Sequence, residues 1–358
     1  MPPHPATPAI HADPTPDALI VGAGAFGLWT ARACHARGLR VEICDAGRVG
    51  AAEGASGGPV GALAPHRPWP WTALKALQFE AIRDLPDRLA ALEAETGRAT
   101  GGARLGRAAP LASAEARARA EQRLPEAALR WPGFRQWIED APAGLVAPHG
   151  VLRDDLTARL APRPTAEALR AVLPPQAIRD GDPLLDASDP RRPVLASGPR
   201  PAGATVLAAG VAIRGLLSMP TLEPEHGQAA RLGAVPPSGT PLIQAPGLWI
   251  VPQRDHVAIG STSERGREDL ETDAGLDALI AGARALLPAL AEAPVLERWA
   301  GLRPRLASRG PLGGELAPGL LVATGGFKIG LALAPAVGEA IAAVLCGEPN
   351  PLAPDFRP

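Results

Sequence analysis

The sequence is poor in several residue types that mark particular classes of protein. Its three cysteines in 358 residues are widely spaced in apolar segments, so we expect them to be small core side chains and to form neither a disulfide framework nor a metal site. A reducing cytoplasm is consistent with this pattern. A formal net charge of −1 gives no global attraction to nucleic acid or to an anionic membrane. No apolar run is expected to reach the roughly 18 residues of a membrane span. Only two lysines occur, Lys75 and Lys328, so the location of each is of interest.

The N-terminal segment also lacks the features of a targeting sequence. Residues 1–16 are rich in proline and have neither a basic region nor an apolar stretch, so we do not expect them to be a signal peptide. We expect this segment to be a disordered tail.

The most informative feature present is a glycine pattern between Asp17 and Asp45. Apolar residues 18–21 predict a buried strand, residues 25–38 predict a helix closed by glycine, and residues 40–44 predict a second strand. The turn between the first strand and the helix carries G-x-G-x-x-G at Gly22, Gly24 and Gly27. This order of elements is a βαβ unit.

Each position of this unit suits dinucleotide binding. Gly22 permits the tight turn, Gly24 lets backbone approach a pyrophosphate, and Gly27 lets helix and strand pack closely. The start of the helix, at Ala25 and Phe26, offers free N–H groups to phosphates. Asp45, followed by Ala46, can accept hydrogen bonds from ribose hydroxyls, which favours FAD or NAD over NADP without separating the first two.

A second glycine-rich segment runs from Gly54 to His66. It is too apolar for a solvated linker and suits close approach of backbone to a ligand, the alternative being a floppy loop. Trp69 and Trp71 follow, and then an amphipathic helix over residues 72–96.

The middle of the chain changes pattern twice. Residues 101–150 are arginine-rich and predict helix, with Trp131, Phe134 and Trp137 spaced for one helix face in the core or in a substrate pocket. Residues 204–209, which end in Ala209 and are followed by Gly210, predict a buried strand that ends in a turn. Strand-like pieces then follow, with a hairpin over residues 248–260, a helix over 274–290 and a further segment over 295–302.

Near the C-terminus the chain again reads as strand, glycine turn and helix. The strand covers residues 320–324, the turn is Gly325-Gly326-Phe327-Lys328-Ile329-Gly330, and the helix extends to about Leu345. A helix dipole aimed at a flavin pyrimidine ring stabilises the anionic reduced form, which favours FAD over a nicotinamide.

Together these pieces resemble the D-amino-acid oxidase, glycine oxidase and sarcosine oxidase family of FAD-dependent enzymes. The resemblance covers most of residues 17–345 and rests on five stretches in order: GAGAFG, GASGGPVGALAPH, TVLAAG, VPQRDHVAIGSTSE, and the pair GLRPR and GGFKIGLALAPAVGE. It implies an α/β fold. A discontinuous Rossmann-like FAD-binding domain would cover residues 17–85, 150–217 and 300–346, with an inserted mixed α+β substrate domain at 86–149 and 218–299.

The resemblance also implies roles for particular residues. Ser56 and the backbone around Gly57 and Gly58 would touch FAD. Arg303 of the G-x-R-P stretch would bind the substrate carboxylate, and Lys328 would do a similar job beside the flavin. A structural salt bridge is the alternative for Arg303, and flavin contact or oxygen activation is the alternative for Lys328. His66, with the tryptophans that follow it, would line the entrance or assist deprotonation of the amine, unless it is a loop histidine satisfied by backbone.

The chain also departs from the family pattern. It contains no tyrosine, so the active-site tyrosines of some D-amino-acid oxidases are missing. The cysteine that tethers flavin in sarcosine oxidases is absent after Arg303, so FAD is expected to be non-covalent. Val211 and Ala212 stand where relatives often carry tryptophan.

The implied reaction transfers a hydride from the carbon beside an amine nitrogen to the flavin and leaves an imine that water hydrolyses, while O2 reoxidises the flavin and gives H2O2. The substrate would be a small amine or amino acid. Three alternatives stay open: an oxidase acting on carboxymethylaminomethyl-uridine in tRNA, a dehydrogenase that passes electrons to a carrier, and a non-catalytic flavin-binding partner.

Overall fold

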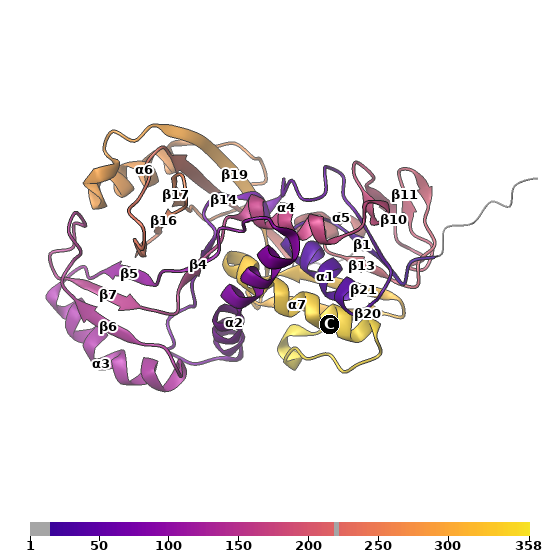
Figure 1. Cartoon of the computed structure of the whole chain (residues 1–358), viewed down its shortest axis with the longest axis horizontal. Helices are drawn as coiled ribbons and strands as arrows, with labels where there is room; N and C mark the ends of the chain where they lie inside the picture. The colour runs from indigo at the N-terminus through magenta and orange to yellow at the C-terminus, as the bar shows by residue number, and fades with distance from the viewer. Residues whose placement is uncertain (1–14, 218–221) are drawn as a thin grey trace, which may run out of the picture.

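Residues 15–217 and 222–358 are described in a computed structural model of the chain (Figure 1). Most of the predicted N-terminal tail, and the predicted domain start at residue 218, lie outside these residues. The first sheet has the strand order β20-β21-β13-β1-β2-β9. Its parallel strands are β1 (Ala18–Val21), β2 (Val41–Cys44), β9 (Ile178–Arg179), β13 (Thr205–Leu207) and β21 (Leu320–Gly325), and β20 (Pro311–Ala317) is the antiparallel edge. The predicted βαβ unit is therefore confirmed.

Helices α1 (Ala25–Ala36) and α7 (Gly330–Leu345) pack on this first sheet. Helices α2 (Ala73–Thr96) and α4 (Pro162–Val172) pack against these two helices, and the short α5 (Ile213–Leu216) follows β13. Helices α1 and α7 pack tightly because Gly338 has no side chain: a Cβ there would lie 2.7 Å from the carbonyl carbon of Trp29. Contact this close fixes the two helices relative to each other, and both begin at the same edge of the sheet (Figure 1).

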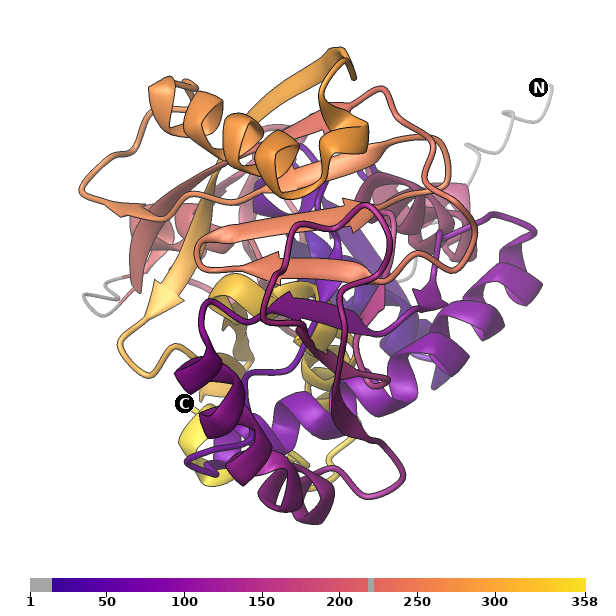
Figure 2. The same cartoon turned by 90° about the vertical axis from the view of Figure 1, so that its left-hand side faces the viewer.

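The second sheet is larger and mixed. Its order is β18-β14-β17-β16-β15-β5-β7-β6, and β19 pairs with β14. The strands are β5 (Arg107–Pro110), β6 (Gln136–Glu139), β7 (Val151–Asp154), β14 (Leu222–Leu232), β15 (Leu242–Ala245), β16 (Leu248–Pro252), β17 (Val257–Gly260), β18 (Glu264–Arg265) and β19 (Val295–Leu306). Helix α6 (Ala274–Leu286) covers β14, β16 and β17, as Figure 2 shows in orange, and α3 (Ala114–Arg130) packs beside β6.

Two small three-stranded sheets complete the architecture. One consists of β3 (Ala62–Leu63), β8 (Ala158–Arg159) and β4 (Ala103–Arg104), and the other of β10 (Leu184–Asp186), β11 (Val194–Leu195) and β12 (Gly198–Pro199). The α/β fold is as predicted. The division into two domains stays a prediction, and the pairing of β7 with β5 groups residues 151–154 with the larger sheet.

Several predictions about local structure are confirmed. Helix α2 begins after Thr72, whose side chain caps it by accepting a hydrogen bond from the Lys75 backbone N–H at 3.3 Å. The hairpin of β16 and β17 and the C-terminal strand, turn and helix also match the prediction. Lys75 has a structural position, since its Nζ donates to the carbonyls of Trp69 and Pro70 at 2.9 and 2.7 Å.

The prediction for residues 101–150 is wrong in part. Only α3 is helical there, and the rest forms β4, β5, β6 and connections. Trp131 ends α3, Phe134 lies in a loop and Trp137 lies in β6, so the three aromatic residues do not share a helix face. The strands are only two to four residues long, too short to show a period in the sequence.

Two expectations from composition also need correction. The cysteines are free, but only Cys34 and Cys44 are buried, whereas Cys346 is exposed. Residues 327–345 are long and apolar enough to span a membrane, contrary to the expectation that no such run exists. However, 61% of this apolar window is buried inside the protein, and a core helix meets the same criterion, so the span is weakly supported.

Candidate active site

A cavity of about 920 Å³ is lined by residues from both large sheets. It lies where the carboxyl ends of β1, β2, β13 and β21 meet residues of β15, β16 and β19. Parallel sheets bind ligands at this edge. All predicted site residues except Gly27, Gly57 and Gly326 line the cavity.

The first glycine turn has the geometry that its sequence predicts. Gly22 has φ +100°, and a Cβ there would lie 2.6 Å from the Cα of Ala209. A Cβ on Gly27 would lie 1.8 Å from the carbonyl oxygen of Gly22, so Gly27 allows helix and turn to pack although it does not line the cavity. Gly24, the residue before α1, has no side chain to cap the helix, so beyond the Ala25 N–H, which donates to Ser56, the N–H groups of the first turn are available to an anion.

Asp45 lies at the cavity beside this turn. Its Oδ2 accepts a hydrogen bond from the Ala23 N–H at 2.6 Å, and its Oδ1 accepts one from the Gly47 N–H at 2.9 Å. A carboxylate has about four acceptor positions, so further hydrogen bonds can form. The carboxylate therefore orders the turn and keeps acceptor capacity toward the cavity.

The segment from Gly54 to His66 runs along the cavity as predicted. The Ser56 hydroxyl accepts a hydrogen bond from the Ala25 N–H at 2.9 Å, which ties this segment to the start of α1. Gly58 lies under Trp299, whose ring would be 3.0 Å from a Cβ at that position. Gly57 does not line the cavity and packs against the backbone of Ala52 instead. A Cβ on Gly57 would lie 1.7 Å from the carbonyl oxygen of Ala52.

The C-terminal turn places a second helix start at the same cavity. Gly325, Gly326 and Phe327 all have positive φ, at +78°, +76° and +41°. Gly326 packs against Phe26, since a Cβ there would lie 2.9 Å from the phenyl ring, and this contact explains why it does not line the cavity. Like α1, α7 begins without a side-chain cap. Two helix starts, each with a positive dipole end, thus border one cavity.

Two cationic side chains lie at the end of the cavity formed by β19 and the C-terminal turn. Arg303 extends over Gly227, where a Cβ would lie 2.0 Å from its guanidinium, and its Nη1 donates to the Thr262 carbonyl at 3.1 Å. Burial lowers the pKa of Arg303, while the Glu225 carboxylate raises it. Burial also lowers the pKa of Lys328, as does the charge of Arg303. The two charges lie close enough to repel, so a bound anion would be stabilised there.

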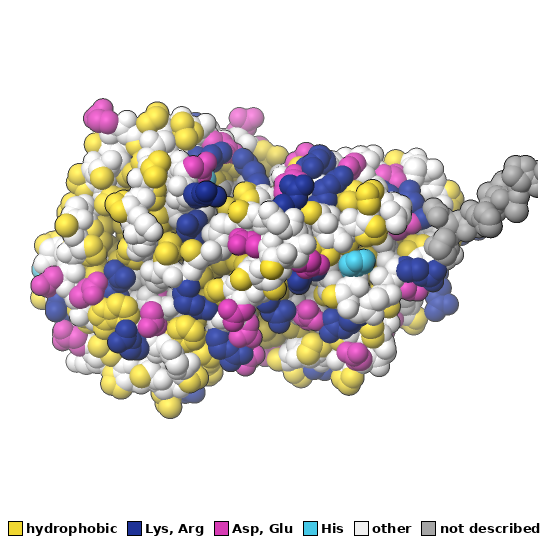
Figure 3. Space-filling view, viewed as in Figure 1, with side chains coloured by type: hydrophobic (Ala, Val, Ile, Leu, Met, Phe, Trp, Pro, Cys, Tyr) yellow, Lys and Arg dark blue, Asp and Glu magenta, His cyan; other side chains and the backbone are white. Residues whose placement is uncertain are grey.

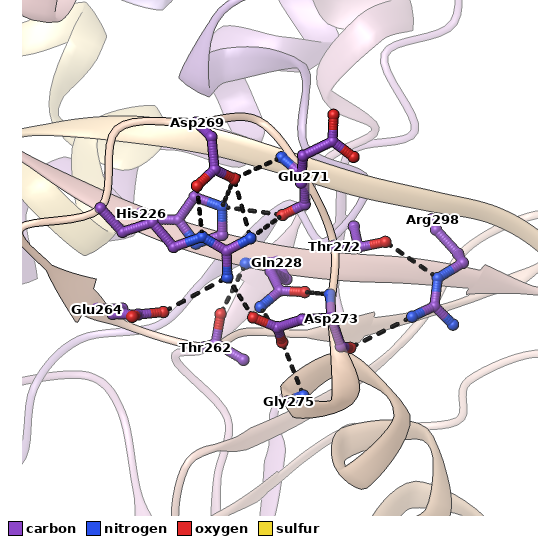
Figure 4. Close-up of polar contacts among 11 residues, drawn as sticks. His226, Gln228, Thr262, Glu264, Asp269, Glu271, Thr272, Asp273, Gly275 and Arg298 are labelled. Carbon is purple, nitrogen blue, oxygen red and sulfur yellow. Dashed lines mark hydrogen bonds and ion pairs between the residues drawn. The ribbon is translucent and has the colours of Figure 1, made fainter.

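The carbonyl that accepts from Arg303 belongs to a loop held by many polar contacts (Figure 4). The Gln228 N–H donates to the Thr262 hydroxyl at 2.9 Å, while the Gln228 side chain exchanges hydrogen bonds of 2.8 Å with Asp273. The same network includes His226, Glu264, Arg267, Asp269 and Arg298. It fixes residues 261–273 and so orients the carbonyl.

His66 is held from behind by a buried side chain. The fully buried Gln78 accepts a hydrogen bond from the His66 N–H at 3.0 Å, and its Nε2 lies 3.2 Å from His66 Nδ1. Burial lowers the pKa of His66, as do the charges of Lys75, Arg107 and Lys328. The ring is therefore neutral near pH 7.

The tryptophans after His66 do not occupy the predicted position at the entrance. Trp69 and Trp71 are absent from the cavity lining and contact arginines of α3, with Arg123 and Arg130 at 5.8 and 5.6 Å from the ring centroids. Trp299 lines the cavity instead. In the sequence, the sign that Trp299 could lie near the site was its position four residues before Arg303, on what the structure shows to be β19.

Buried Arg107 was also missed by sequence reasoning. It pairs with buried Asp154 at 2.7 Å, donates to Gln244 at 2.8 Å, and lines the cavity. In the sequence it is one of many arginines in a segment without clear pattern. Only the pairing of β5 with β7 shows that it lies inside the protein.

The cavity geometry agrees with comparisons to known proteins. A family model described as FAD dependent oxidoreductase matches residues 17–344. The chain belongs to this family. It is therefore an FAD-dependent oxidoreductase, which confirms the predicted cofactor, enzyme class and family resemblance.

Individual relatives agree with this assignment. Glycine oxidase from Pseudomonas aeruginosa is 30% identical over 370 residues, which cover 95% of this chain and 98% of that protein. The crystal structure of glycine oxidase from Geobacillus kaustophilus has a TM-score of 0.84 at 24% identity, covering 96% of this chain and 98% of that chain. The crystal structure of iminodiacetate oxidase from Chelativorans has a TM-score of 0.81 at 23% identity, covering 95% of this chain and 98% of that chain. The two structures show the same fold.

Proposed function

We propose that the enzyme oxidises the C–N bond of a small amino acid or N-substituted glycine. The observation that carries this proposal is the pair Arg303 and Lys328 at one end of a cavity that also borders the starts of α1 and α7. Full-length similarity to a glycine oxidase supports the substrate class. When bound, FAD supplies the two-electron acceptor for the carbon next to the amine nitrogen, and O2 reoxidises it to give H2O2.

The residues present fit FAD. The turn at Gly22 and Gly24 with the start of α1 would hold the pyrophosphate, and Asp45 would accept from the ribose. Ser56 and the turn at Gly325 would border the flavin, with the dipole of α7 favouring negative charge on the ring. We propose that FAD is held without a covalent bond.

The cationic pair would bind and orient the substrate carboxylate. A guanidinium can make two parallel hydrogen bonds to a carboxylate, whereas an ammonium contributes a point charge. Because Arg303 is anchored to the Thr262 carbonyl, the carboxylate would be held in one orientation. Fixed orientation brings the oxidised carbon to the flavin and lowers the entropic part of the barrier.

His66 would act on the amine nitrogen. A neutral imidazole can accept a proton from an incoming ammonium group, and the pKa of His66 is lowered by burial and by nearby cations. Gln78 would keep the ring in position through Nδ1. Because Gln78 donates to Nδ1, the neutral ring carries its hydrogen on Nε2, so Nδ1 is the atom that would take the proton, and the hydrogen bond from Gln78 would break as it does so.

The test uses the purified FAD-bound enzyme under anaerobic conditions. Glycine, sarcosine, proline and D-amino acids are mixed with it separately while the flavin absorbance near 450 nm is recorded. Bleaching by at least one, followed by H2O2 release when air is admitted, is the expected result. Bleaching without H2O2 in air would identify a dehydrogenase, and no bleaching by any of them would reject the substrate class.

The tRNA alternative has less support. In Figure 3 the basic side chains on the visible face are interleaved with acidic ones, and α3 arginines such as Arg117 and Arg123 pair with Glu121 and Glu126. Paired charges give little attraction to phosphate backbones. A salt-sensitive complex with modified tRNA would favour the alternative. We place the enzyme in the cytoplasm on the basis of its three free cysteines.

A further inference from the structure

A second, smaller cavity adjoins the cationic end of the main one. Its volume is about 200 Å³, and it shares Phe327 and Lys328 with the main cavity. Its other lining residues are Glu225, Ser263, Arg265, Arg305 and Arg309. Four of the seven lining side chains are cationic and one is anionic.

The single carboxylate is already neutralised within this group. Glu225 is 5% exposed, accepts a hydrogen bond from the Ser263 hydroxyl, and lies 3.5 Å from Arg305 Nε and 3.9 Å from Arg265 Nε. Arg305 is satisfied further by Glu223 at 2.9 Å. The carboxylates of Glu225 and Glu223 therefore balance the charges of Arg305 and Arg265, two of the four cations.

The other two cations are left without such partners. Within residues 15–217 and 222–358, the side chains of Arg309 and Lys328 make no hydrogen bond or ion pair, and Lys328 has only a ring contact with Phe327 at 5.3 Å. Burial and the charges of Arg303 and Arg309 lower the pKa of Lys328, whereas the Glu225 carboxylate raises it, and Arg309 is exposed to solvent. A cavity with two unmatched positive charges is suited to an anion.

The strand register connects this cavity to the proposed carboxylate site. On β19, Arg303 and Arg305 are two residues apart, so they lie on the same face and their Cα atoms are separated by about 7 Å. They are opposite Glu225 and Glu223 on β14. Arg303 extends toward Gly227 and the main cavity, while Arg305 contacts the two glutamates at the small one.

We propose that the small cavity binds a second acidic group of the substrate, so that the enzyme prefers amines that carry two acidic groups over those that carry one. This inference rests on the proposed function, since it assumes that the first carboxylate binds at Arg303. The second group would lie between Arg309 and Lys328, a short chain of bonds away from the oxidised carbon. Neutral extensions of the same length would gain nothing there.

Binding can be measured without turnover by using acids that contain no amine. Thiodiacetate carries two carboxylates and (methylthio)acetate carries one, and otherwise the two probes share the same skeleton. Each is titrated into the FAD-bound enzyme, and Kd is read from the perturbation of the flavin absorbance. We expect thiodiacetate to bind at least tenfold more tightly, because a charge-assisted hydrogen bond contributes enough for about that factor.

Arg309→Asn removes one unmatched charge. Arg309 has φ +59°, a conformation that asparagine tolerates, so the variant should fold and retain flavin. The preference for thiodiacetate should fall about tenfold, and Arg309→Lys should restore most of it. Arg254→Asn is the matched control, because Arg254 is an exposed arginine that lines neither cavity.

Two outcomes would overturn the inference: equal Kd values for the two probes, or a preference that Arg309→Asn leaves intact. If inorganic phosphate tightens binding of (methylthio)acetate while thiodiacetate has no advantage, the cavity takes a free anion and the inference is also rejected. Failure of the proposed function is distinguishable, because thiodiacetate would then bind while neither sarcosine nor iminodiacetate bleaches the flavin.

Discussion

Replacement of Arg303 by methionine tests the proposed carboxylate site most sharply. The variant removes the guanidinium but keeps an unbranched side chain of similar length, and Gly227, over which Arg303 extends, leaves room for either side chain. The hydrogen bond to the Thr262 carbonyl is also lost, but that carbonyl belongs to a loop fixed by other contacts. The protein should therefore keep its fold and its flavin.

The magnitude follows from the position of the side chain. Truncating one partner of a desolvated, hydrogen-bonded charge pair costs about 2–5 kcal/mol. Lys328 remains as a second cation at the same end of the cavity. The expected loss of binding free energy therefore lies in the lower half of this range, at about 3 kcal/mol. That loss corresponds to a roughly 150-fold increase in the Kd of the carboxylate substrate.

The assay is anaerobic reduction of the flavin at increasing concentrations of glycine, which separates Kd from the limiting rate. Arg254→Met is the matched control, because Arg254 is an exposed arginine that lines neither cavity. We expect the flavin of the Arg254→Met variant to be reduced at the unaltered rate. A Kd for Arg303→Met within threefold of the natural enzyme, with flavin retained, would refute the carboxylate role of Arg303.

Three further predictions concern the turn, the base and the helix packing. Gly22→Val should abolish FAD binding, measured by flavin absorbance after gel filtration, because φ is +100° and a Cβ would lie 2.6 Å from Ala209. The rate of flavin reduction should not depend on pH above about 6.5, where His66 is neutral, and it should fall as the pH drops through the lowered pKa of His66, since protonation removes the base; an acid limb that persists in His66→Gln would contradict this. Gly338→Ala should destabilise the protein by about 1–3 kcal/mol in urea unfolding, because its Cβ would lie 2.7 Å from the Trp29 backbone; an unchanged midpoint would contradict the tight packing of α1 and α7.

Features with a strong local signal were predictable from the sequence. The turn at Gly22 needs positive φ and no Cβ, and only glycine meets both demands, so the pattern marks the turn directly. The start of α2 at Thr72 and the turn at Gly325 are similar cases. In each case the physical requirement falls on the residues that carry the signal.

Features that depend on strand pairing were not predictable. Glu225 and Gly227 lie opposite or beside Arg303 only because β14 pairs with β19 in one register, and that register is not written in either strand alone. Arg107 is buried because β5, a strand of four residues, pairs with β7. Trp69 was expected at the cavity by its closeness to His66 in sequence, yet it lies against α3.

The central claim is that the turns at Gly22 and Gly325, from opposite ends of the chain, hold one FAD. The most direct measurement is the visible spectrum and flavin content of the purified protein after added FAD is removed by gel filtration. We predict a yellow protein with one FAD per chain, released intact by denaturation because it is not covalently bound. A folded protein that stays colourless after incubation with FAD would contradict the account.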